Sequence, residues 1–225
     1  MSSSDALRVI VTGLIGQYPI GGNAWAYYQW ALGLQRLGHD VYYFEDTGQW
    51  PYNPLEGGVS GGCDYNVAYI ETIMSAGGMG DRWAYRFPWE ARWFGLSDAK
   101  RAEVVATADL LIDVSGTLER PHEYRGVERI AFIDTDPVFT QVKLARGQED
   151  YRKIVDAHDI HFSFGEVRSE AVPETGHEWL PTRQPVVLDE WQPVDHHRES
   201  FTTIMNWTSF NPVTYEGRTY GQKDE

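Results

Sequence analysis

The chain has 225 residues, of which 42% are hydrophobic and 23% charged, so its composition is globular and gives no reason to expect disorder. The formal net charge of −14 argues against nucleic acid or an anionic membrane as a partner, because clustered Lys and Arg hold both. The single cysteine, Cys63, allows no internal disulfide, and neither a leader pattern nor an apolar run of about 18 residues occurs, so the sequence predicts a cytoplasmic protein without a membrane span.

The first 46 residues have the pattern of one βαβ unit. Leu7 to Leu14 contains a nearly continuous β-branched run that ends in glycine, typical of a strand buried on both faces of a parallel sheet. A helical stripe runs from Asn23 to Leu37, and we expect Asn23 to cap this helix and Gly38 to end it. Asp40 to Glu45 then predicts a second strand that stops at acidic residues.

The later elements continue the alternation of strands and helices. Thr47 to Gly80 is a long excursion rich in Gly and Pro, with a helix expected at Tyr65 to Ser75. The elements expected after it are a short strand at Trp83 to Phe87, a helix from a Ser97 cap to Ala108, strands at Asp109 to Val114 and Arg129 to Ile133, one helix from Val138 to Ala157, and a strand at Ile160 to Phe164. This order predicts an α/β fold with a doubly wound, Rossmann-like parallel sheet.

Composition also suggests three parts along the chain. Residues 1–188 carry the strand and helix pattern, residues 189–200 are polar enough for a linker, and residues 201–225 begin a second domain. Phe201 to Asn206 predicts the first strand of that domain, but only 19 residues follow it, too few to bury another core.

The opening of the chain resembles the retaining GT-B glycosyltransferases of the large family 4 type. A strand ends in Thr12-Gly13, a loop closes on Gly21-Gly22 before a helix, and LQRLGHDVYYFED at Leu34 to Asp46 is similar to the helix-to-strand turn of that family. The match covers mainly the first 46 residues. The resemblance implies an acceptor-side N-terminal domain that faces a donor-binding C-terminal domain.

What the resemblance implies for function is transfer of a sugar from a nucleotide-sugar donor to an unknown acceptor, without a further cofactor. In this family the second domain holds most of the donor, through groups that would lie beyond Glu225. We therefore expect the chain to bind its substrates without transferring sugar, and apolar side chains of the second part, Phe201, Ile204 and Trp207, to pack poorly or to lie against the first domain.

Ligands of an open parallel sheet bind outside the carboxyl ends of its strands, and this rule selects the candidate binding residues. Gly21, Gly22 and Asn23 open a helix whose free N–H groups and dipole favour a phosphate, although a turn that needs positive φ would also explain the glycines. The other candidates for contact with substrate are Glu45, Asp46, Ser115, Gly116 and His122. Ser115 and Gly116 could equally form a turn, and His122 could equally be an ordinary loop residue.

Asp134 and Asp136 are the candidate catalytic residues, because they follow a buried strand. As a DxD sequence they could hold Mg²⁺ or Mn²⁺, as in the GT-A transferase fold, contact a polar ligand, or cap the helix that starts near Pro137. The GT-B-like opening argues against the metal, so no metal site is expected.

Two other functions remain open at this point. A nicotinamide-dependent enzyme would share the strand, glycine turn and helix, but Gly13 and Gly16 do not complete GxGxxG, and Glu45 lies 32 residues after Gly13 (45 − 13) instead of about 20. A non-catalytic sugar-binding or interaction domain is consistent with the nine Trp and 13 Tyr.

Overall fold

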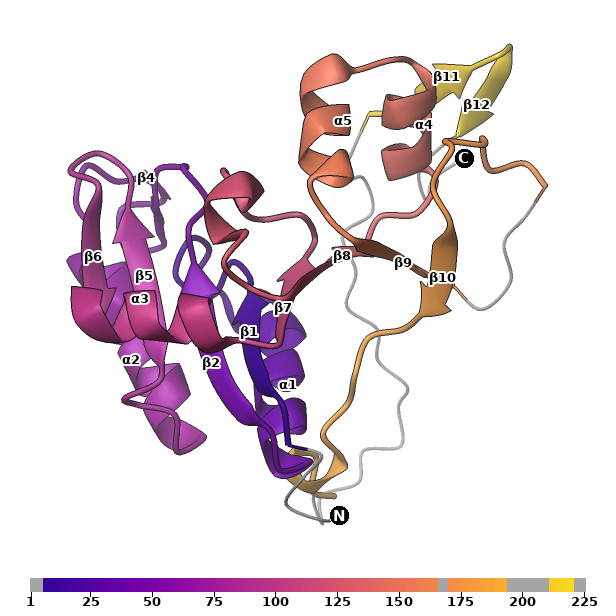
Figure 1. Ribbon diagram of the computed structural model, residues 1–225. Helices are drawn as coiled ribbons and strands as arrows, with labels where there is room; N and C mark the ends of the chain where they lie inside the picture. The colour runs from indigo at the N-terminus through magenta and orange to yellow at the C-terminus, as the bar shows by residue number, and fades with distance from the viewer. Residues whose placement is uncertain (1–5, 166–169, 194–210, 221–225) are drawn as a thin grey trace.

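The structure is a computed structural model that describes residues 6–165, 170–193 and 211–220. The strands of its central sheet are β1 (Arg8–Thr12), β2 (Asp40–Glu45), β5 (Trp83–Phe87), β6 (Arg92–Gly95), β7 (Leu110–Val114), β8 (Arg129–Asp134), β9 (Ile160–Phe164) and β10 (Trp179–Thr182). They form an eight-stranded sheet in the order β10-β9-β8-β7-β1-β2-β5-β6 (Figure 1). All neighbours in it are parallel except β5 and β6, which pair antiparallel.

Helices lie on both faces of the sheet. They are α1 (Gly21–Arg36), α2 (Asp64–Ala76), α3 (Asp98–Thr107), α4 (Phe139–Ala145) and α5 (Glu149–Asp156), with short 3₁₀ turns η1 (Pro121–Tyr124) and η2 (Leu188–Glu190). Because side chains alternate along a strand, Val11 faces the core under α1 and α2, whereas Ile10 faces the core under α3. The expected α/β class with a mostly parallel sheet is confirmed, and the architecture is consistent with a Rossmann-like fold.

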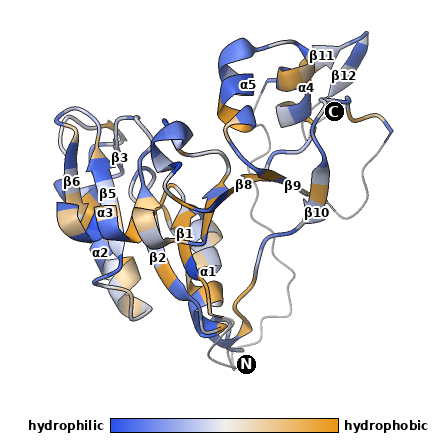
Figure 2. Cartoon of the chain, viewed as in Figure 1, coloured by the Kyte–Doolittle hydropathy of each residue, from blue (hydrophilic) through white to orange (hydrophobic). Residues whose placement is uncertain are grey.

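The hydrophobic residues concentrate where the two cores meet the sheet. Figure 2 shows hydrophobic colour along β1, the central strand, and mostly hydrophilic colour on α5. A smaller cluster of Phe132, Leu144 and Val155 joins β8 to α4 and α5 on the same face as α3. The sheet is therefore best covered at its centre, whereas β9 is only half-buried along its whole length.

Two predictions about helices were wrong. The helix expected over Val138 to Ala157 is interrupted, because Gly147 adopts a left-handed φ of 71° and separates α4 from α5. The first helix starts at Gly21, with Ile20 as its uncapped N-cap, so Asn23 does not cap it. The predicted Ser97 cap is confirmed, since its side chain accepts a hydrogen bond from the Lys100 N–H at 3.2 Å.

Two short hairpins lie outside the sheet. β3 (Tyr52–Asn53) and β4 (Gly58–Val59) form one within the predicted excursion, and β11 (Val213–Tyr215) and β12 (Arg218–Tyr220) form the other. The second hairpin lies against α4, where the Arg146 guanidinium donates to the Thr214 carbonyl. The strand predicted at Phe201 to Asn206, with Ile204 and Trp207, falls outside the described residues.

The chain after β10 returns to α1. Gln184 donates its amide to the Ala26 carbonyl at 2.8 Å, and Gln29 accepts from the Val187 N–H at 3.0 Å. This return lies along α1 and leaves Gly21 and Gly22, in its first turn at the carboxyl edge of the sheet, exposed. Among the described residues, no helix combines the length and apolar character needed to cross a membrane.

Candidate functional site

The sheet has a topological switch point between β1 and β7. From β1 the strands proceed to β2 and β5 in one direction, while β7, on the other side of β1, leads to β8, β9 and β10 in the opposite direction. In parallel sheets the carboxyl ends at such a point are the usual place for a ligand. The segments that follow these strand ends begin at Gly13, Ser115 and Thr135.

The first turn of α1 is open. Gly21 and Gly22 are exposed, the first turn holds no acidic residue, and the N-cap Ile20 supplies no side-chain hydrogen bond. The first helical bond runs from the Ala24 N–H to the Ile20 carbonyl, so the preceding N–H groups have no partner within the helix.

Nothing in the fold requires glycine at these two positions. Gly21 and Gly22 do not have positive φ, and a Cβ added to either would meet no atom within 4 Å. The turn-geometry explanation for Gly21 and Gly22 is therefore not supported. Asn23 instead fixes the preceding loop, because its amide donates to the carbonyls of Leu14 at 2.7 Å and Tyr18 at 2.9 Å.

A chain of hydroxyl groups joins α1 to the segments after β7 and β8. The Tyr27 hydroxyl donates to Ser115 Oγ at 3.2 Å, and Ser115 Oγ lies 2.7 Å from Thr135 Oγ1. Burial raises the pKa of Tyr27 to about 12, which keeps this hydroxyl a neutral donor. Ser115 and Gly116 have φ of 66° and 60°, and a Cβ on Gly116 would come within 2.5 Å of the Phe132 ring. Left-handed backbone at a non-glycine residue such as Ser115 is often associated with a functional site.

Beneath these hydroxyls lies a buried cluster that the sequence did not single out. Asp113 accepts hydrogen bonds from Thr12 Oγ1 at 2.8 Å and the Thr117 N–H at 2.7 Å, and its second oxygen lies 3.1 Å from His158 Nε2. All of Asp113 and the His158 side chain are buried. The sequence signal for this cluster was the single acid within the apolar strand LLIDV, but its partner His158 is 45 residues away. The cluster fixes the turn that carries Ser115.

Glu45 holds the loop between β1 and α1. Its fully buried carboxyl group accepts from the N–H groups of Gly16 at 2.9 Å and of Gln17, and from the Tyr43 hydroxyl at 2.6 Å. Burial raises the pKa of Glu45 to about 7, against these hydrogen bonds, which lower it. The Gly16 and Gln17 amides are thereby occupied, whereas Gly21 and Gly22, at the start of α1, are exposed.

Asp46 faces the other side of the sheet, under α3. It is buried, accepts from the Tyr124 hydroxyl at 3.1 Å and lies 3.1 Å from the Arg86 guanidinium. Burial raises the pKa of Asp46, and the charge of Arg86 opposes that shift. Asp46 lines a cavity of about 410 Å³ that includes Trp93 and Arg101, whereas the predicted His122 is exposed on η1.

The two candidate catalytic aspartates occupy different environments. Asp134 is buried and accepts from Thr140 Oγ1, Gln141 Nε2 and Ser163 Oγ, each at 2.8 Å. Asp136 instead lines a cavity of about 220 Å³ with Lys143, and partial burial, followed by the charge of Asp134, raises its pKa. The geometry gives Asp134 a structural role and leaves Asp136 as the residue that a substrate could reach.

The loop at Asp136 is strained. Val138 has φ of 76°, a conformation that is rare for a β-branched residue.

Within the described ranges, no group of three or more His, Cys, Asp or Glu side chains is placed to hold a metal ion, so Asp134 and Asp136 have no third ligand there.

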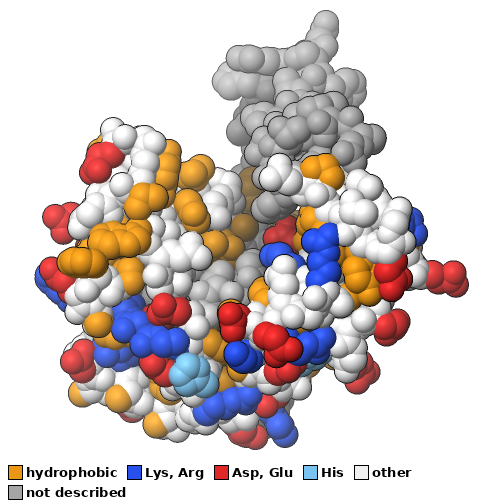
Figure 3. Space-filling model, turned by 90° about the horizontal axis from the view of Figure 1, so that it is seen from above, with side chains coloured by type: hydrophobic (Ala, Val, Ile, Leu, Met, Phe, Trp, Pro, Cys, Tyr) orange, Lys and Arg blue, Asp and Glu red, His pale blue; other side chains and the backbone are white. Residues whose placement is uncertain are grey.

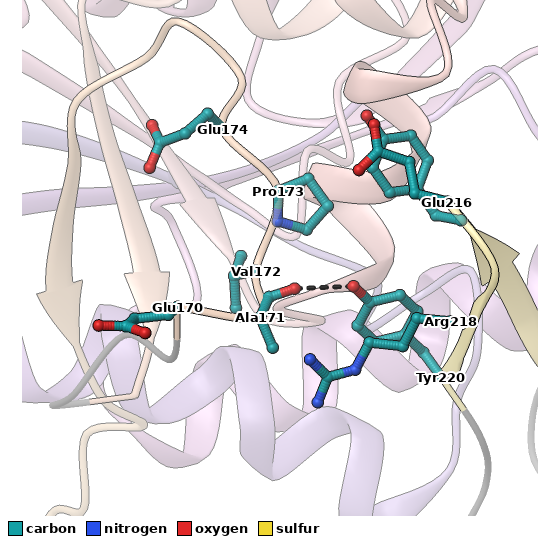
Figure 4. A pocket seen from close by; sticks show the side chains of 9 residues that line it. Glu170, Ala171, Val172, Pro173, Glu174, Glu216, Arg218 and Tyr220 are labelled. Carbon is teal, nitrogen blue, oxygen red and sulfur yellow. Dashed lines mark hydrogen bonds between the residues drawn. The ribbon is translucent and has the colours of Figure 1, made fainter.

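A larger cavity, of about 540 Å³, lies away from the switch point (Figure 4). It separates the β11–β12 hairpin from the segment at residues 170–174, and the Tyr220 hydroxyl crosses it to donate to the Ala171 carbonyl at 2.7 Å. The Arg218 guanidinium lies over the Tyr220 ring, 5.6 Å from its centre. These contacts belong to the packing of the hairpin, and we place the candidate site at the switch point.

No family model matches the chain, and no curated protein matches it.

Proposed function

We propose that the chain is the Rossmann-like, acceptor-side half of a glycosyltransferase that uses a nucleotide-sugar donor. In this proposal the first turn of α1 takes the diphosphate of the donor, and Ser115, Thr135 and Asp136 face the acceptor. The resemblance of the first 46 residues to GT-B enzymes supports the reaction class.

The observation that carries the proposal is the pair of glycines at the start of α1. Glycine in a helix costs roughly 0.5–1 kcal/mol relative to alanine, and neither φ nor packing accounts for Gly21 and Gly22. A ligand that must approach the backbone does account for them, because helix N–H groups and the helix dipole bind phosphate best when no side chain intervenes.

Asp136 is the proposed proton acceptor. Transfer of a sugar to an acceptor hydroxyl requires that hydroxyl to lose its proton, and a carboxylate with a raised pKa is better matched to this task near neutral pH. The Lys143 ammonium lines the same cavity and favours the charged form of Asp136.

A nicotinamide cofactor is supported less well. In dinucleotide-binding folds the acid after the second strand contacts the ribose, and here Glu45 is fully buried and bound to loop amides. That carboxyl group has no access to a ribose.

A thermal-shift screen tests the proposal. We expect UDP- or GDP-sugars at millimolar concentration to raise the unfolding midpoint of the chain, because a ligand that binds only the folded state stabilises it by mass action. Stabilisation by NAD or NADP in place of the sugar nucleotides would favour the dehydrogenase. Stabilisation by free glycans alone would favour a non-catalytic binding domain.

A further inference from the structure

Exposed aromatic and aliphatic side chains gather beside the proposed diphosphate site. In the described part of the chain, six of the twelve exposed large hydrophobic residues come from the loops between β1 and α1, around β3 and β4, and between β5 and β6. These six are Tyr18, Ile20, Trp50, Leu55, Val59 and Trp89. Figure 3, seen from above, shows hydrophobic side chains gathered over the part of the molecule that carries these loops. Four of the other six, Leu180, Val186, Leu188 and Trp191, follow one another along the segment that returns from β10 to α1, whereas these six come from three separate loops. A grouping that three loops build together calls for an explanation.

Two aromatic pairs form the fixed part of this surface, which we call the aromatic rim (Trp50, Trp89, Tyr18 and Tyr52). The rings of Trp50 and Trp89 are 5.2 Å apart at 35°, and those of Tyr18 and Tyr52 are 6.1 Å apart at the same angle. Trp50 is supported from behind by an edge-on contact with Phe87 at 6.0 Å. Trp89 is 71% exposed, so much of its ring meets solvent.

Gln17 connects both pairs to the loop that leads into α1. Its side-chain amide donates to the Trp50 carbonyl, and its main-chain carbonyl accepts from the Tyr52 N–H at 2.9 Å. The main-chain N–H of Gln17 donates a hydrogen bond to the Glu45 carboxyl group. The main chain at Trp50 and Tyr52 is therefore positioned by the same loop that leads to Gly21.

The groups around the rim fit a neutral, hydroxyl-rich ligand. Gln49 is exposed beside Trp50, and Glu90 and Arg92, 3.8 Å apart and both exposed, follow Trp89 along the chain. Flat ring faces pack on the C–H face of a sugar, and amide, carboxylate and guanidinium groups bond its hydroxyls. The net charge of −14 opposes a polyanion or an anionic lipid surface at this site.

We propose that the aromatic rim binds a neutral oligosaccharide by stacking on Trp89 and Trp50. The further assignment of this oligosaccharide as the acceptor rests on the proposed glycosyltransferase function. Binding of the oligosaccharide at the rim is independent of that function, because it is measured without any sugar nucleotide.

The test is a titration of the chain with cellohexaose, maltohexaose and mannohexaose, followed by calorimetry and by tryptophan fluorescence. At least one hexaose is expected to bind. Trp89→Ala should weaken that binding roughly tenfold through loss of one stacked ring, and Trp89→Phe should retain most of it. Trp191→Ala is the matched control, since it removes a ring that is also exposed but lies against Trp25 on α1 and belongs to none of the rim loops.

Three results would overturn the proposal. The first is that no hexaose binds at millimolar concentration, and the second is that Trp89→Ala and Trp191→Ala weaken binding equally. The third is that Trp89→Ala abolishes binding of the chain to neutral phosphatidylcholine vesicles and leaves oligosaccharide binding intact. Thermal unfolding of each variant shows that it is folded. Failure here leaves the diphosphate site untouched, because stabilisation by sugar nucleotides is a separate measurement.

Discussion

Glu45 illustrates how far single residues could be interpreted from the sequence. Its place at the end of a strand was predicted, because DVYYFE stops at acidic residues, and β2 ends there. The direction of its side chain was not predictable, since that depends on contacts with Gly16 and Gln17, which precede it by 29 and 28 residues. From the sequence, Glu45 was predicted to contact a ligand, whereas in the structure its hydrogen bonds hold the loop between β1 and α1.

Glu45 gives the protein a measurable pH dependence. An unfolded glutamic acid loses its proton near pH 4.5, whereas folded Glu45 keeps it up to about pH 7. The folded state therefore binds the proton more tightly, and the free energy of unfolding should fall as pH rises from about 4.5 to about 7, by up to about 3 kcal/mol.

Glu45→Gln removes this titration. Urea unfolding of both proteins across pH 4 to 8 measures how the free energy of unfolding depends on pH. The variant is expected to be destabilised at low pH, because its amide NH₂ meets the Gly16 N–H. Its deficit relative to the parent should shrink as pH rises through the window and level off above it. Parallel curves for the two proteins would refute the assignment.

Secondary-structure elements were predicted better than their ends. The buried strands and α3 were recognised from apolar runs and from the Ser97 cap, which are local features. The break at Gly147 was missed because apolar residues continue at helical spacing on both sides of it. Its positive φ is stabilised by a hydrogen bond from the Gly147 N–H to the Leu144 carbonyl at 3.0 Å.

Two Gly→Ala substitutions, one between α4 and α5 and one in the first turn of α1, should therefore have opposite effects. Gly147→Ala should destabilise the protein by about 1–2 kcal/mol, since a side chain disfavours the left-handed backbone. Gly22→Ala, where the backbone is helical and the space open, should stabilise it by up to about 1 kcal/mol. Chemical denaturation measures both, and the same sign for the two changes would show that the α4–α5 break or the α1 start is placed wrongly.

At the scale of the whole molecule, the alternation of strands and helices was enough to predict a mostly parallel α/β sheet. Strand order, the antiparallel β6 and the contact of the returning chain with α1 depend on long-range packing, which no local pattern encodes. The edge of the sheet that carries the candidate site could be predicted from the parallel strand order, because the carboxyl ends of β1, β7 and β8 must lie on the same side. The buried Asp113–His158 contact needed the fold itself.

The central claim is that the open first turn of α1 binds the diphosphate of a sugar nucleotide, and calorimetry of Gly22→Asp beside Gly22→Asn tests it most directly. The two side chains have nearly the same shape, and a Cβ at this position meets no neighbour, so the variants differ mainly in charge. An acidic side chain in the first turn stabilises a helix by about 0.3–1 kcal/mol but repels phosphate. We predict that Gly22→Asp unfolds at the same or a higher temperature than Gly22→Asn and binds the sugar nucleotide selected by the screen at least roughly tenfold more weakly. Equal affinity of the two variants would contradict the account, because the diphosphate would then bind elsewhere.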